Sequence, residues 1–182
     1  MNNLQKKYQD EVSPKLKEEF QITNDLALPK LEKILINAGM AEALQNKESL
    51  EKMKEQLAQI SGQMPKITTA KKSISTFKLK AGDPIGLMIT LRGKRAWDFL
   101  EKFIFVVVPR IRDFRGVSQN KFDNRGNYSI GLVEQTIFPQ LDLSKVDKTR
   151  GIVVTLVFAK SDRVKSKKLL DLLGLPFRKA ES

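Results

Sequence analysis

The 182-residue sequence predicts an α+β protein, a two-layer sandwich in which helices pack on one face of a mostly antiparallel, mixed sheet. Helical and strand patterns are interspersed without a regular β-α-β rhythm, and hairpin-like strand pairs occur among them. A hydrophobic content of 41% is enough to bury one sizeable core. Since no linker or internal repeat divides the chain, we expect a single domain over residues 1–182.

Hydrophobic periodicity predicts each element in turn. Apolar residues every three or four positions indicate helices, and apolar–polar alternation indicates half-buried strands. The expected elements are a helix over residues 4–20, a strand over 31–39, a helix over 46–60, strands over 66–69, 74–80 and 85–92, a helix over 95–108, strands over 127–134 and 151–158, and a helix from 161 or 162 to 173.

Proline, glycine and aromatic residues refine these elements. Pro14 interrupts the first helical pattern, so we expect a kink or two short helices, the second capped by Ser13. Gly62 is a natural C-terminal stop for the helix before it. The aromatic residues of the helix over 95–108 have core spacing, which favours burial over a role as a stacking platform. In the last helix, Val164 is expected on the buried face.

The charge balance favours a polyanionic partner. Lys and Arg number 33 and Asp and Glu 21, giving a net charge of +12 and a pI near 9.9. A basic protein of the membrane surface would carry a long cationic amphipathic helix, which is missing here. The longest apolar run, residues 103–108, is too short to span a bilayer, and the chain opens with no signal segment. We expect a cytoplasmic protein with no membrane partner.

The residue types that are missing narrow the chemistry. The sequence contains no Cys and no His, which excludes thiolate nucleophiles, the Ser-His-Asp arrangement and most transition-metal sites. Neither GxxxxGK[ST] nor GxGxxG occurs. We therefore expect no catalytic residue, no metal site and no cofactor. An enzyme that relies on lysine or carboxylates is the weakest of the functions considered.

One basic segment points to RNA. Between Glu55 and Asp83 there is no acidic residue, and five lysines alternate with Ser, Thr and β-branched residues. Phosphate oxygens bind cations and small donors, whereas base edges bind amides and hydroxyls. A strand–loop–strand unit of this composition is suited to RNA, and a hairpin kept soluble by lysine is the alternative.

A polar surface is expected on the open face of the sheet. Strand alternation places Asn37, Thr90 and Arg92 on the face opposite the buried residues, with Gln63 nearby at a helix-to-strand junction. Neutral amides and hydroxyls can hydrogen-bond RNA sugars and bases. The alternative for each residue is local capping of its own backbone.

An irregular basic stretch, residues 110–127, is long for a connector. Arginines lie close together in it, and Gly116 and Gly126 are expected to loosen its backbone. We interpret it as a mobile loop with a contact role, and a solvated loop is the alternative. The basic residues of the last helix are either a phosphate-facing surface or, more simply, a solvated face.

Ordered sequence blocks carry a resemblance over nearly the whole chain. They are LEKILINAG (31–39), ISGQ (60–63), PKITTAKKS (65–73), GLMITLRG (86–93), FDNRGNYSIG (122–131), EQTIFP (134–139) and DKTRG (147–151). In this order they resemble the family of bacterial ribosomal protein five of the large subunit, which binds 5S rRNA. The resemblance implies docking of 5S rRNA in the central protuberance, beside 23S rRNA and other ribosomal proteins. It also implies contacts with the P-site tRNA and with a protein of the small-subunit head.

The resemblance assigns roles to individual residues. The 5S rRNA contacts carry over to Asn37, Gln63 and Thr90, and we add Arg92 and Lys66 as candidates from the same surface.

The segment over residues 69–75 matches the family's tRNA-facing loop. The residues implied for the tRNA contact are Thr69, Lys71, Lys72 and Ser73. Many family members carry an Arg-Lys pair where this chain has two lysines, so the charge is kept but a planar fork for phosphate is lost.

The bridge between the subunits has two candidate segments. One is the stretch over residues 110–127 with Arg112, Arg115 and Arg125, and the other is the block at residues 147–151. We expect a non-enzymatic RNA-binding constituent of the large ribosomal subunit, located in the cytoplasmic ribosome. The alternative is a stand-alone RNA-binding chaperone or regulator.

Overall fold

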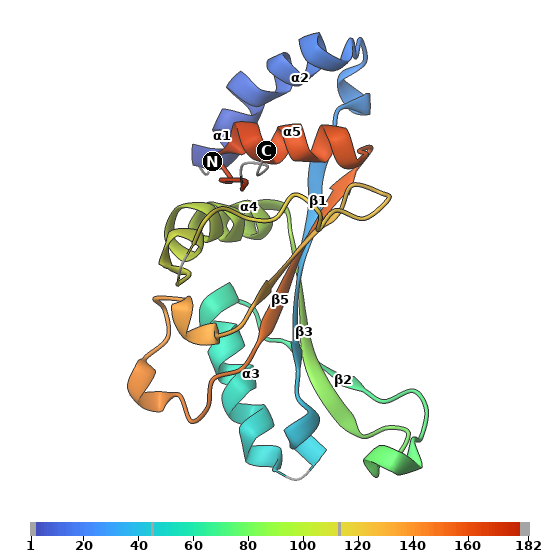
Figure 1. The fold of residues 1–182 in the computed structure, drawn as a ribbon, viewed down its shortest axis with the longest axis vertical. Helices are drawn as coiled ribbons and strands as arrows, with labels where there is room; N and C mark the ends of the chain where they lie inside the picture. Colours follow the sequence, from blue (N-terminus) through green and yellow to red (C-terminus); the bar gives the residue numbers. More distant parts are fainter. Residues whose placement is uncertain (1–2, 45, 113, 179–182) are drawn as a thin grey trace. The chain divides into compact units, whose positions relative to one another are not determined.

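A computed structural model describes residues 3–44, 46–112 and 114–178, and Figure 1 shows the fold. Five strands form an antiparallel sheet in the order β2-β3-β1-β5-β4, which confirms the predicted α+β sandwich. The strands are β1 (Lys30–Gly39), β2 (Lys66–Thr69), β3 (Pro84–Arg92), β4 (Tyr128–Leu132) and β5 (Ile152–Ala159). Each lies within two residues of its predicted ends.

The chain divides into two compact units. One consists of Met1–Ile34, Leu91–Ile130 and Thr155–Ser182, and the other of Leu35–Thr90 and Gly131–Val154. Strands β1, β3, β4 and β5 each contribute residues to both units. The single domain expected over residues 1–182 stays a prediction.

The first unit contains four α-helices in its described part, α1 (Asn3–Lys7), α2 (Ser13–Phe20), α4 (Gly93–Lys102) and α5 (Arg163–Leu173). Helices α1 and α2 are joined by a π-helical turn, Tyr8–Val12, in which the Ser13 amide donates to the Tyr8 carbonyl. This wider turn ends at Val12, two residues before Pro14, whose nitrogen has no hydrogen to donate. Ser13 is therefore not the expected N-cap, because Val12 occupies that position with helical backbone angles.

Helix α4 continues through a π-helical turn, Phe103–Val107, and a 3₁₀ turn, Val108–Arg110. Trp97, Phe99 and Phe103 are buried, as the spacing predicted, whereas Phe105 is 55% exposed. The ring of Trp97 lies 5.3 Å from that of Tyr8. The prediction for Val164 is wrong, because this side chain is 66% exposed. It lies in the first turn of α5, whose buried residues begin at Ser166.

The second unit contains α3 (Lys47–Ser61), which begins and ends as the sequence predicts. The Asn46 side chain accepts hydrogen bonds from the amides of Glu48 and Ser49, a standard N-cap arrangement. Gly62 ends the helix with a φ of +70°, a left-handed conformation that glycine adopts at low cost. The predicted apolar stripe, Leu50, Met53, Leu57 and Ile60, is buried.

The two faces of the sheet differ in burial. On β1 the buried side chains are Ile34, Ile36 and Ala38, and on β3 they are Leu87, Ile89 and Leu91. Side chains that alternate with these point to the other face, which stays partly open. No described helix is long and apolar enough to cross a membrane.

Candidate nucleic-acid interface

Strands β1 and β3 are neighbours in the sheet, and each turns a polar side chain to its open face. Asn37 and Thr90 are both half-buried there. Among the described residues, neither side chain has a hydrogen-bond partner. A half-buried amide and a half-buried hydroxyl with free bonding capacity can take a polar ligand with little rearrangement.

Gln63 is held beside β3 by the end of α3. The Ser61 hydroxyl donates to the Leu57 carbonyl at 2.8 Å and accepts from the Gln63 amide at 3.2 Å. The Gln63 side-chain amide then donates to the backbone carbonyl of Thr90 at 3.2 Å. The helix end is thereby tied to the strand that carries Thr90. The local-capping alternative does not describe this bond, because Thr90 lies 27 residues away from Gln63 along the chain.

Lys66 lies on the same face of the β2–β3 pair as Met88. Lys66 is paired with Met88 in the antiparallel register, and directly opposed residues share a face. Met88 and Thr90 alternate along β3 and so point the same way. Lys66 is exposed, and Arg92 lies 3.5 Å from the carboxylate of Glu32. Both cations are exposed to solvent; Lys66 has no ion pair with a described residue, whereas Arg92 is paired with Glu32.

The segment after β2 is anchored by backbone hydrogen bonds. The amide of Ala70 donates to the Asp83 carbonyl at 2.8 Å, and the Gly82 amide donates to the Ala70 carbonyl at 2.9 Å. The Ser73 hydroxyl accepts from the Ala81 amide at 2.9 Å, so this side chain stabilises the turn. The remaining residues of the candidate tRNA contact, Thr69, Lys71 and Lys72, are exposed.

The strand predicted over residues 74–80 is wrong. Ile74 and Leu79 form an isolated bridge, and Ser75–Phe77 is a 3₁₀ turn between them. Lys78 follows with a φ of +51°. The segment is therefore a hairpin tip in which four residues close the loop. Polar and apolar residues alternate in this segment as they do in a strand, which is why the sequence predicted one.

The stretch over residues 110–127 is packed more closely than predicted; residue 113 lies outside the described residues. A Cβ atom on Gly116 would lie 2.5 Å from the Arg178 backbone nitrogen, and one on Gly126 would lie 2.5 Å from the Asp162 carbonyl oxygen. The expectation that these glycines loosen the backbone is wrong, because each permits a close approach with φ above +70°.

Aromatic packing anchors the end of the same stretch. The rings of Phe122 and Tyr128 lie 4.4 Å apart, and Tyr128 is 5.8 Å from Phe177. The Tyr128 hydroxyl donates to the Ser118 carbonyl at 2.6 Å, and burial raises the pKa of this phenol to about 12. Although the stretch is anchored in this way, the side chains of Arg112, Arg115 and Arg125 are exposed.

The turn that presents Arg125 is built by Asp123. The Asp123 carboxylate accepts from the backbone amides of Arg125 and Asn127 and from the Asn127 side chain. Partial burial acts to raise the Asp123 pKa, but the hydrogen bonds from Asn127 and Arg125 outweigh it and lower the pKa. A carboxylate that stays ionised keeps this turn closed.

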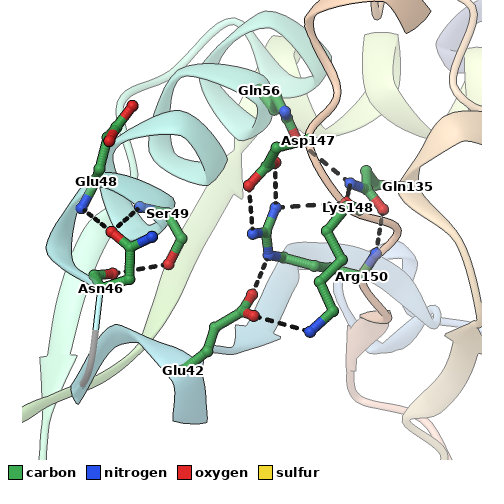
Figure 2. Close-up of polar contacts among 9 residues, drawn as sticks. All are labelled: Glu42, Asn46, Glu48, Ser49, Gln56, Gln135, Asp147, Lys148 and Arg150. Atoms are coloured by element: carbon green, nitrogen blue, oxygen red, sulfur yellow. Dashed lines mark hydrogen bonds and ion pairs between the residues drawn. The ribbon is translucent and has the colours of Figure 1, made fainter.

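A charged network that sequence reasoning missed is centred on Arg150 (Figure 2). Its guanidinium group donates to both carboxylate oxygens of Asp147, and its Nε donates to Glu42. The Arg150 side chain is only 6% exposed. Hydrogen bonds from Arg150 lower the pKa of Asp147 to about 2 and, together with Lys148, lower that of Glu42.

The backbone next to Arg150 is held by Gln135. The Gln135 side chain accepts from the Arg150 amide and donates to the Lys148 carbonyl at 2.7 Å and to Gln56 at 3.3 Å (Figure 2). The Arg150 guanidinium group is thus occupied by hydrogen bonds within the chain, so it is not available to a partner of the block at residues 147–151. The interpretation of that block as a bridge segment is weakened accordingly. The i, i+3 spacing of Asp147 and Arg150 was the one signal in the sequence.

The candidate residues fall into two groups. Asn37, Gln63, Lys66 and Thr90, with the tip of residues 69–80, belong to the second unit, and Arg92 and the exposed arginines of residues 110–127 belong to the first. No group of three or more acidic, His or Cys side chains in the described part of the chain could hold a metal ion. What the second unit offers is a polar sheet face flanked by cations, which suits RNA.

Comparison with known proteins identifies the family. A family model for ribosomal protein L5 matches residues 24–80, and a model for the C-terminus of the same ribosomal protein family matches residues 84–177. The chain belongs to the ribosomal protein L5 family. The large ribosomal subunit protein uL5 of Symbiobacterium thermophilum is 53% identical over 177 residues, covering 97% of this chain and 98% of that protein.

Other relatives are similar over the same length. The protein uL5 of Thermus aquaticus is 53% identical over 97% of both chains, and that of Roseiflexus castenholzii is 51% identical over 96% of this chain and 97% of its own. This family is structural and non-enzymatic, and in bacteria it is located in the cytoplasmic ribosome. The predicted family, the non-enzymatic role and the ribosomal location are confirmed. The chain is a structural constituent of the large subunit, with rRNA and other ribosomal proteins as partners.

Proposed function

We propose that this chain binds 5S rRNA with the open face of β1 and β3 and helps to attach it in the central protuberance. The observation that carries the proposal is the hydrogen bond from Gln63 to Thr90 at 3.2 Å. It joins the helix end to the strand, so that Asn37, Gln63 and Thr90 belong to one fixed polar surface of the second unit. Fixed donors and acceptors lose little conformational entropy on binding.

The chemistry of this surface divides into two parts. Asn37 and Thr90 are neutral and half-buried, so they are suited to sugar hydroxyls and base edges. Lys66 is an exposed cation on the same face of the β2–β3 pair as Met88, and it is suited to phosphate oxygens. Arg92 is an exposed cation of the first unit, and it is a second candidate for a phosphate contact. Neutral contacts would set the register of the RNA, and the cations would supply the salt-dependent part of the affinity.

Two further contacts belong to the proposal. The exposed tip with Thr69, Lys71 and Lys72 contacts the P-site tRNA, where Ser73 holds the turn in shape. The exposed arginines of residues 110–127 contact a protein of the small-subunit head. On the large subunit itself, 23S rRNA and the neighbouring proteins of the central protuberance complete the set of partners.

The experiment measures binding of a 5S rRNA transcript to the purified protein over a range of salt concentrations. Asn37→Ala and Thr90→Val should each weaken binding by about 1–3 kcal/mol, because a polar group of the RNA loses its partner. The dependence of the Kd on salt should stay unchanged, since no charge is removed. Lys66→Ala should instead reduce that dependence by about one phosphate contact.

Two controls complete the test. Lys52→Ala removes an exposed cation of α3 that is ion-paired with Glu48, and it should leave 5S rRNA binding unchanged. Wild-type affinity in both Asn37→Ala and Thr90→Val, with folding verified by thermal unfolding, would show that this face is not the binding surface. A stand-alone chaperone would leave large subunits in a high-salt wash, whereas a structural constituent would stay bound.

A further inference from the structure

Phe77 is the most exposed phenylalanine of the described residues. Its side chain is 70% exposed, and the next in order, Phe105, is 55% exposed. Phenylalanine has no polar atom that benefits from water, so such exposure costs hydrophobic free energy in the free protein. Single exposed apolar residues are common on surfaces. Exposure alone therefore does not indicate a function for Phe77, and the residues around it have to be considered.

The backbone that carries Phe77 is closely fixed. Ile74 and Leu79 exchange two hydrogen bonds, at 2.9 and 3.1 Å, and so close a four-residue loop. Within the loop, the Phe77 amide donates to the Ile74 carbonyl at 3.2 Å, and the Lys78 amide donates to the Ser75 carbonyl at 2.9 Å. The ring is consequently presented from a formed turn, and little order has to be gained on binding.

The charge around the ring has one sign. Lys71, Lys72, Lys78 and Lys80 are all exposed, and none of them forms an ion pair with a described residue. The carboxylate at the base of the tip, Asp83, accepts from the backbone amide of Lys80 at 2.7 Å and is thereby engaged. A flat apolar ring among unpaired cations is complementary to a ligand that joins a π face to negative charge. A nucleotide has both.

We propose that Phe77 stacks on a nucleobase of the RNA whose phosphates the surrounding lysines contact. The proposal rests on the function proposed above for the tip and adds to it a residue outside the implied tRNA-contacting set. Since the ring makes no hydrogen bond, it accepts any base whose face is open, and it gives affinity with little sequence discrimination. Stacking needs the π face of the ring, whereas a purely hydrophobic contact needs only apolar surface area.

The test uses ribosomes assembled with the variant protein, and it measures the Kd of P-site tRNA over a range of salt concentrations. Phe77→Ala should weaken tRNA binding by about 5-fold to 150-fold, the factor expected for one stacked base, with the salt dependence unchanged. Phe77→Trp should bind as well as the wild type or better. Phe77→Leu, which keeps apolar area but has no π face, should resemble Phe77→Ala. Phe105→Ala, at the other exposed phenylalanine, should have no effect.

The outcomes separate the two proposals. If Lys71→Ala/Lys72→Ala weakens tRNA binding and Phe77→Ala does not, the tip contacts tRNA but the stacking proposal is wrong. If neither variant weakens binding, both proposals are wrong. Binding of Phe77→Leu at wild-type affinity would also overturn stacking.

A photocrosslinking experiment identifies the partner directly. A benzoylphenylalanine at position 77 should crosslink to a base of the bound tRNA. A crosslink to a protein instead would show that the tip is a protein-docking surface and would overturn the proposal.

Discussion

Arg150 binds Asp147 through two parallel hydrogen bonds, from Nη1 to Oδ1 at 2.7 Å and from Nη2 to Oδ2 at 2.8 Å. Both partners belong to the segment that leads into β5, and the pair closes this segment onto itself. Because a guanidinium fork matches the two carboxylate oxygens, the contact fixes both distance and orientation. Glu42 adds a third acceptor from a distant part of the chain.

Arg150→Ala should destabilise the protein strongly. Asp147 and Glu42 would lose their common partner and repel each other, and a buried cation site would become a void. We expect a loss of about 3 kcal/mol in the free energy of unfolding, at the lower end of the range for breaking a buried pair. Urea titration measures the loss. Lys148→Ala is the matched control, because Lys148 is 66% exposed and should cost less than about 0.5 kcal/mol.

Acid should weaken the same pair. The pKa of Asp147 in the folded chain is about 2, below its ordinary value of 3.8. The unfolded chain therefore takes up the proton first, and the contribution of the pair is complete above about pH 5 and fades as the pH falls through 3.8 to 2. The difference in unfolding free energy between the wild type and Asp147→Asn should shrink over that range. A difference independent of pH from 2 to 6 would contradict the assignment.

Sequence reasoning located the polar face because its signals are local. Alternation along β1 and β3 assigns Asn37 and Thr90 to one side whatever the rest of the chain does. The Arg150 network was missed because its acceptor Glu42 lies 108 residues away, and nothing local marks such a pairing.

The error over residues 74–80 has a different cause. Polar and apolar residues alternate in a short strand, and they alternate in the same way in a four-residue loop that is closed by a single bridge. Only the backbone angles, such as the positive φ of Lys78, separate the two structures. Val164 was misplaced for a related reason, since one apolar residue in the first turn of a helix does not define its face.

Gly86→Ala should separate the strands that carry the polar face. A Cβ atom at this position would lie 2.8 Å from the Ala38 carbonyl oxygen and 3.0 Å from the Thr68 hydroxyl oxygen. Backbone would have to move, and we expect a loss of about 1–3 kcal/mol in stability together with weaker 5S rRNA binding. Gly39→Ala is the control in β1, because a Cβ there meets nothing within 4 Å. Equal stability of the two variants would show that β1 and β3 tolerate separation.

Replacing Arg112, Arg115 and Arg125 together by Gln should weaken association of the two ribosomal subunits. These side chains are exposed on a closely packed stretch, so their charges can be removed without disturbing the fold. Sucrose-gradient profiles at several magnesium concentrations measure the association, and 5S rRNA binding should stay at the wild-type level. Normal association with reduced 5S rRNA binding would reverse the assignment of these arginines.

Changing both Lys71 and Lys72 to Ala should lower the affinity of the ribosome for P-site tRNA and spare 5S rRNA binding. Two unpaired cations on an exposed tip supply phosphate contacts, so their loss reduces the dependence of binding on salt. Occupancy of the P site should fall mainly at high salt, where the remaining contacts are screened and binding is no longer saturated.

Lys52→Ala/Lys54→Ala is the matched control for this last variant. It removes the same charge from the same unit at two lysines that are ion-paired within α3, and it should leave tRNA occupancy unchanged. Equal losses in the two double variants would mean that only net charge matters. Loss of 5S rRNA with normal tRNA occupancy in the Lys71→Ala/Lys72→Ala variant would instead place the tip in the structural interface with 5S rRNA, because a tip that faces tRNA has no reason to support 5S rRNA docking.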